Sequence, residues 1–135
     1  MQNKKLDDLI SQLESYVESW KQFNAYVTLA RGKKYTQDDE LQFLEVKSVI
    51  TQNLELILAS IEAGGPSRED IHALIATAPS IRYLSELQEG SLRTIENNWH
   101  KIYVGMQSLL GQLKVKQRDV ESQSRWGSLF GGKKK

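Results

Sequence analysis

The chain has 135 residues, 39% of them hydrophobic and 26% charged, with no cysteine and a formal net charge of +1. This length and composition fit one domain that buries a core without metals or disulfides. The lack of cysteine excludes disulfide frameworks, thiolate metal sites and cysteine nucleophiles. Residues 1–8 contain no apolar signal-peptide core and no stretch reaches 18 apolar residues, so we expect no membrane span and a cytoplasmic location.

The charge is unevenly distributed along the chain. Residues 114–135 contain seven basic and two acidic residues, a net charge of +5, whereas residues 1–113 have a net charge of −4. An acidic body with a basic C-terminal segment is typical of a tail with a partner of its own.

The first predicted helix covers residues 4–31, where apolar residues recur at alternating intervals of three and four. We expect it to end at Gly32, because glycine readily adopts the left-handed conformation of a helix cap. Its apolar stripe consists of Leu6, Leu9, Leu13, Tyr16, Trp20, Phe23, Val27 and Ala30.

The second predicted helix begins after Thr36, which with Asp39 has the spacing of a capping box, and runs to Ala63 before Gly64, Gly65 and Pro66. Several of its apolar residues lie off the main stripe: Leu41, Leu44, Val49 and Leu56. A helix that is apolar around more than half of its circumference is covered on two sides. It is therefore either the central helix or the face of a homodimer.

A short helix over residues 67–78 should be capped by Ser67 and ended by Pro79. Ser80 then opens one continuous final helix to about Leu113, whose apolar stripe has Gly90 on its opposite side. Trp20 and Trp99 occupy stripe positions, so we expect both in the core.

These patterns predict an all-α fold, an antiparallel helical bundle of three long helices plus a short corner helix. The bundle domain should cover residues 1–122, and residues 123–135 should form a flexible basic and aromatic tail.

No constellation of residues indicates catalysis. Glu69 and His72 have the spacing of a helical metal-ligand pair, but a two-metal bundle needs that pair twice, and the second histidine, His100, has asparagine three residues before it. Glu96 and His100 could form an acid–base pair only if they lined a cleft. We therefore expect no enzyme, no cofactor and no metal site, with a carboxylate-rich metal-binding bundle as the alternative.

The tail contains large apolar residues that the bundle stripes do not include. Solvated tails are usually poor in such residues, whereas this one combines aromatic, aliphatic and basic side chains: Arg125, Trp126, Leu129, Phe130, Lys133, Lys134 and Lys135. Three interpretations remain open, namely contact with its own bundle or dimer, a linear motif for another protein, and contact with an anionic membrane surface.

Two short resemblances bear on the linear-motif interpretation. Ser128-Leu129-Phe130 resembles the end of the bacterial sliding-clamp binding motif, with Trp126 where that motif begins with glutamine. Gly127-Ser128-Leu129 is similar to the core of the peptides that direct cargo into encapsulin shells, which have a smaller aliphatic residue before the glycine. Over the body of the chain, the Trp in the first and last helices resembles a spectrin-like three-helix repeat, from which the corner at Pro79 departs.

The sequence thus predicts a non-enzymatic protein-interaction module or adaptor whose C-terminal tail engages a protein partner, with a homodimer through the off-stripe face of the second helix. A membrane surface ranks below a protein partner. Nucleic acid is not expected, because the body is net acidic and the basic residues are confined to one short segment.

Overall fold

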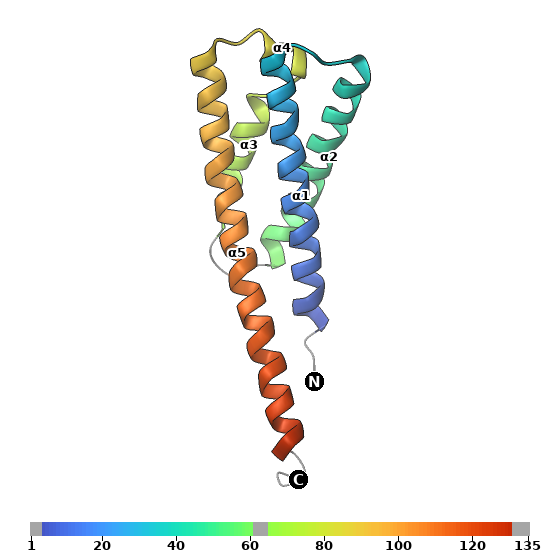
Figure 1. Cartoon of the computed structure of the whole chain (residues 1–135), viewed down its shortest axis with the longest axis vertical. Helices are drawn as coiled ribbons and strands as arrows, with labels where there is room; N and C mark the ends of the chain where they lie inside the picture. The colour runs from blue at the N-terminus through green and yellow to red at the C-terminus, as the bar shows by residue number, and fades with distance from the viewer. Residues whose placement is uncertain (1–3, 61–64, 131–135) are drawn as a thin grey trace.

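The computed structural model describes residues 4–60 and 65–130, with side chains as far as Gln123. Within these ranges the chain forms helices and no strand, which confirms the predicted all-α bundle (Figure 1). The helices are α1 (Lys4–Gly32), α2 (Gln37–Ser60), α3 (Arg68–Ala76), α4 (Ile81–Ser85) and α5 (Glu89–Phe130).

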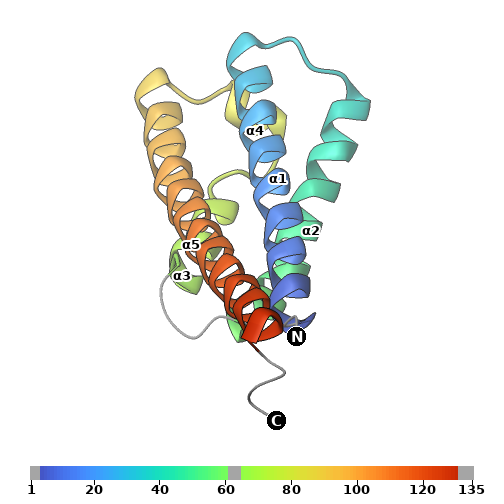
Figure 2. The same cartoon turned by 60° about the horizontal axis from the view of Figure 1, so that its bottom comes forward.

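The helices run alternately up and down. α1 and α2 are antiparallel, α3 and α4 together return toward the end where α1 finishes, and α5 runs back along α1 (Figures 1 and 2). α1 packs against α2, α4 and α5, while α3 lies between α2 and α5. The two short helices therefore act as a third, interrupted arm of the bundle.

α1 is the central helix because it packs against three other helices, α2, α4 and α5. Its buried residues are Leu6, Ile10, Leu13, Tyr16, Val17, Trp20, Phe23, Val27 and Ala30. Burying a large apolar side chain contributes roughly 1.5–3 kcal/mol before the entropy cost of ordering it. The interpretation of the second helix as central is therefore wrong.

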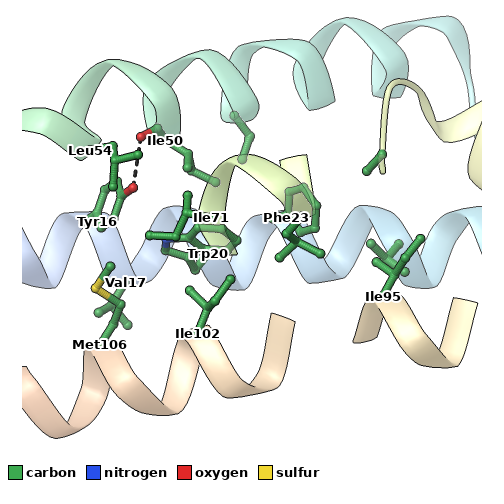
Figure 3. Packing of buried hydrophobic residues seen from close by; sticks show 14 of the residues in the cluster. Tyr16, Val17, Trp20, Phe23, Ile50, Leu54, Ile71, Ile95, Ile102 and Met106 are labelled. Carbon is green, nitrogen blue, oxygen red and sulfur yellow. Dashed lines mark hydrogen bonds between the residues drawn. The ribbon is translucent and has the colours of Figure 1, made fainter. Parts of the chain in front are cut away.

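A chain of aromatic rings runs through this core (Figure 3). Tyr16 meets Trp20 edge to face, with ring centroids 6.3 Å apart. Trp20 lies 5.6 Å from Phe23, and Phe23 lies 5.5 Å from Phe43 of α2. These separations fall in the favourable range for aromatic pairs. The ring contacts therefore stabilise the packing of α1 against α2 beyond the apolar area that they bury.

The prediction of one continuous helix from Ser80 to Leu113 is wrong. The helix that Ser80 caps ends at Ser85, and α5 begins at Glu89. Ile81 and Leu84 are fully buried where α4 packs against α1 and α2. A continuous helix would have kept both residues with the stripe that α5 presents to α1, so the break gains core contacts with α2 as well.

Two side chains of α2 hold the corner at Pro79. Both carboxylate oxygens of Glu40 accept backbone N–H bonds at the start of α4, from Ile81 at 2.8 Å and Arg82 at 2.9 Å. The Lys47 ammonium donates to the carbonyl oxygens of Ala78 at 2.9 Å and Pro79 at 2.7 Å. A negative charge at a helix N-terminus and a positive charge at exposed carbonyl groups both stabilise the turn.

The predicted N-caps Thr36, Ser67 and Ser80 are confirmed, whereas the predicted cap at the end of α1 is wrong. Thr36 and Asp39 form a reciprocal capping box, with bonds of 2.8 Å and 3.1 Å. Ser67 accepts the Asp70 N–H at 3.0 Å. At the end of α1, Gly32 remains helical and Lys33 adopts the left-handed conformation, with φ of 58°. Its N–H still bonds the Ala30 carbonyl oxygen, at 3.1 Å.

α5 is 42 residues long, about 63 Å at 1.5 Å per residue, against about 44 Å for the 29 residues of α1. Gln117 donates to Asp7 at 2.8 Å and Lys114 pairs with Glu14 at 3.0 Å, which fixes the antiparallel register. α5 therefore overhangs the N-terminal end of α1, as predicted (Figure 1). Its helical backbone continues to Phe130, into the range for which a flexible tail is predicted.

Candidate interaction surface

One face of α2 carries apolar side chains that no other described element covers. Leu41 and Leu56 are each 60% exposed and Leu44 is 49% exposed, while Val49 is half-buried. These four residues are the predicted dimer face, and within the described residues neither the corner helix nor α5 covers them. Scattered exposed leucines are ordinary, but three on one helix are a candidate contact surface.

A groove lies between α1 and α2, beside Val49 and Leu56. We call it the α1–α2 groove; it has a volume of about 260 Å³ and is lined by Ser11, Gln12, Ser15, Tyr16, Ser19, Val49, Asn53, Leu56 and Ile57. Two residues of the predicted dimer face, Val49 and Leu56, therefore belong to its α2 wall. The α1 wall is polar and is built from small side chains, so that α1 and α2 leave space between them.

Hydrogen bonds hold the floor and one side of the groove in place. Tyr16 is buried, and its hydroxyl donates to the Ile50 carbonyl oxygen at 3.0 Å, as the dashed line in Figure 3 shows. Burial raises the pKa of this hydroxyl, and the nearby Trp20 indole only partly opposes that rise, so Tyr16 stays a neutral donor. Asn53 donates to the Val49 carbonyl oxygen at 3.0 Å, which fixes one side of the rim.

Sequence patterns did not single out the α1 wall. Ser11, Ser15 and Ser19 recur every four residues and so share one side of the helix. That spacing was the available signal, but small polar residues at regular intervals are equally typical of a solvated helix face. Only the position of α2 beside them turns the serines into a wall of a groove.

The predicted partner-binding tail lies mostly outside the described side chains. The backbone at Arg125, Trp126, Leu129 and Phe130 belongs to α5, but their side chains are outside the described residues, as are Lys133, Lys134 and Lys135 altogether. The part of α5 before them is described: Val115 is 48% exposed, and Lys114 and Lys116 are exposed. The role of the tail therefore stays a prediction.

The residues considered for metal or acid–base chemistry do not come together. Glu69 and His72 are exposed on α3, and the described residues contain no cluster of three or more potential metal ligands. Glu96 accepts two hydrogen bonds from Arg31, at 2.6 Å and 2.8 Å, so its carboxylate is engaged away from His100. Arg31 also binds Glu89 with two bonds of 3.0 Å, and this contact lowers the pKa of the Glu89 carboxyl.

The two tryptophans at stripe positions differ. Trp20 is fully buried, and its indole N–H has no acceptor in hydrogen-bonding geometry. Trp99 is only half-buried: its ring stacks on Tyr103 with centroids 4.7 Å apart, and its indole N–H donates to the Trp20 carbonyl oxygen at 2.7 Å. The expectation that both belong to the core therefore holds for Trp20, whereas Trp99 packs at the edge.

Known proteins give no independent guide to this surface. No protein-family model, curated protein or solved structure matches the chain. Among the described helices, none combines the length and apolar character that crossing a bilayer requires.

Proposed function

We propose that the protein is a non-enzymatic interaction module, a helical bundle that engages protein partners through the exposed face of α2 and through the end of α5. The observation that supports it most directly is the set of exposed leucines on α2, Leu41, Leu44 and Leu56, of which Leu56 lines the α1–α2 groove. Apolar residues flanking a groove with a polar wall are the composition of a docking surface for a protein segment.

The other side of α2 is fixed in place, which suits a docking surface. Phe43, Ile50 and Leu54 are buried against the rest of the bundle, and Glu40 and Lys47 bind the corner before α4. A surface held by a packed helix loses little conformational entropy when a partner binds. We retain a cytoplasmic location in this proposal, because a cysteine-free chain suits a reducing compartment.

The proposal is tested by affinity capture with four forms of the protein: the full chain, a chain ending at Val120, and full-length Leu56→Lys and Val104→Lys variants. Val104 is the matched control, since it is an exposed aliphatic residue, 45% exposed, on α5. We expect one protein to be captured by the full chain and by the Val104→Lys variant, and to be lost with either of the other two.

A captured protein is counted only if the purified partner rebinds with the same dependence on Leu56 and the tail. The proposal is also supported if the full chain associates with itself and this association is lost in the chain ending at Val120 and in the Leu56→Lys variant. If the full chain neither associates with itself nor binds any partner in this pattern, the interaction-module proposal is wrong.

A further inference from the structure

The size and lining of the α1–α2 groove indicate what it accepts. Its volume of about 260 Å³ lies just below the range of about 300–1,000 Å³ that is usual for small-molecule pockets. It is large enough for one or two bulky side chains. The apolar walls from Val49 and Leu56 suit an aromatic ring, while the serine hydroxyls and the side-chain oxygen of Asn53 are acceptors of the kind that a buried indole N–H requires.

The chain contains a segment with matching chemistry at the end of α5. Trp126, Leu129 and Phe130 are spaced i, i+3 and i+4, which is the anchor spacing of helices that bind in grooves. The backbone of these residues is helical. A helical segment pays less entropy on docking than an extended tail would.

The end of α5 cannot reach the groove of its own chain while α5 stays helical. The Gln117–Asp7 and Lys114–Glu14 contacts set the register, and α5 then continues past the start of α1 (Figure 1). At about 1.5 Å per residue, Trp126 lies about 14 Å beyond Gln117, whereas Ser11, at the near end of the groove, lies about 6 Å from Asp7 in the opposite direction. A separation of about 20 Å along the bundle excludes binding within one copy.

Charge favours contact between the end of α5 in one copy and the groove of a second copy. The last 22 residues have a net charge of +5, and the preceding 113 residues have a net charge of −4. No lysine or arginine lines the groove. Glu45 lies one helical turn before Val49, so one end of the groove carries an exposed acidic residue. A basic segment is attracted to this region and a second acidic body is not.

From these observations we propose that the α1–α2 groove of one copy receives the C-terminal end of α5 from a second copy, with Trp126 and Phe130 as the anchors. This inference rests on the proposed function and names the partner as the same chain. When each copy inserts its α5 end into the groove of the other, the two contacts close a two-fold dimer and leave neither groove empty.

The test measures the molar mass of the full-length protein by light scattering at about 100 μM, which populates dimers with micromolar dissociation constants. We expect twice the chain mass for the wild type. The Leu56→Lys variant and the double variant Trp126→Ala with Phe130→Ala should both show once the chain mass. Val104→Lys is the matched control, because Val104 is an exposed aliphatic residue of α5 that does not line the groove, and it should remain a dimer.

Mixing two monomeric variants gives the most specific result. The Leu56→Lys variant keeps an intact α5 end, and the Trp126→Ala, Phe130→Ala variant keeps an intact groove. We expect the equimolar mixture to contain particles of twice the chain mass, because one of the two contacts is restored. Ser15→Arg, which fills the groove from α1, should behave like Leu56→Lys, and circular dichroism confirms that each variant is folded.

Three results would overturn the inference. A wild-type protein of once the chain mass rules out self-association, yet leaves the interaction module intact if a different partner is captured through Leu56 and the tail. A dimer that survives loss of Trp126 and Phe130 but not Leu41→Lys means that α2 pairs face to face. A mixture that stays monomeric shows that the tail and the groove do not bind each other.

Discussion

α1 and α2 are two long amphipathic helices of one bundle, yet they differ in how much of their apolar surface the bundle uses. α1 is covered by α2, α4 and α5, and none of its large apolar residues is strongly exposed. α2 buries one side and leaves Leu41, Leu44 and Leu56 exposed on the other. The comparison shows that apolar residues of α1 are explained by stability, whereas those on the outer face of α2 require another explanation.

The largest effect should come from α1. Replacing Trp20 by alanine removes a fully buried indole from the centre of the aromatic chain, and we expect a loss of about 3–5 kcal/mol in the free energy of unfolding. Urea denaturation followed by circular dichroism measures it. Trp99→Ala should cost clearly less, because Trp99 is half-buried and packs at the edge of the core.

Trp20→Phe is the control for this prediction. It keeps an aromatic ring and removes an indole N–H that has no acceptor, so it should recover a large part of the loss seen with alanine. Equal losses for Trp20→Ala and Trp99→Ala would contradict the central position of α1.

The inner side of α2 should show a smaller effect. Glu40→Gln removes the negative charge that caps α4, and we expect a loss of about 1 kcal/mol, typical of a helix cap. Glu45→Gln, on the exposed side of the same helix, should change stability by less than about 0.5 kcal/mol. Urea denaturation of both variants under the same conditions measures these changes. Similar losses in the free energy of unfolding would mean that the Glu40 contact does not hold the corner.

The ion pairs at the end of α1 predict a pH dependence. Arg31 lowers the pKa of the Glu89 carboxyl in the folded state, so this contact stabilises the fold above the unfolded-state pKa of about 4.3 and is lost as the pH falls below it. Wild-type stability should therefore decrease more between about pH 5 and pH 3 than that of Arg31→Met. Thermal melts across this range test it, with Lys21→Met, which breaks only an exposed pair, as the control.

The smallest effect on folding should come from the outer face of α2. Leu41→Lys and Leu56→Lys should each change the free energy of unfolding by less than about 0.5 kcal/mol, because both side chains are mostly exposed. The free energy of unfolding should be measured on monomeric protein. A loss above about 1 kcal/mol for either variant would show that the leucine supports the fold, and it would contradict the contrast with α1.

Local sequence patterns predict the helices, most of their limits and the residues that α1 buries. Apolar spacing identifies the α1 stripe, and the capping residues Thr36 and Ser67 mark helix starts, because these signals act between residues within one or two turns. The exposed positions of Leu41, Leu44 and Leu56 also followed from helical phase, which separates them from the buried stripe of α2.

The packing of the helices against one another determines which helix is central, where the final stripe breaks and where the groove lies. Ile81 and Leu84 fit the phase of the final helix, but packing against α1 and α2 places them in a separate helix. Ser11, Ser15 and Ser19 form a groove wall only because α2 lies beside them at Val49 and Leu56. Periodicity reports which side of a helix is apolar; the free energy of packing whole helices together selects the neighbour that this side meets.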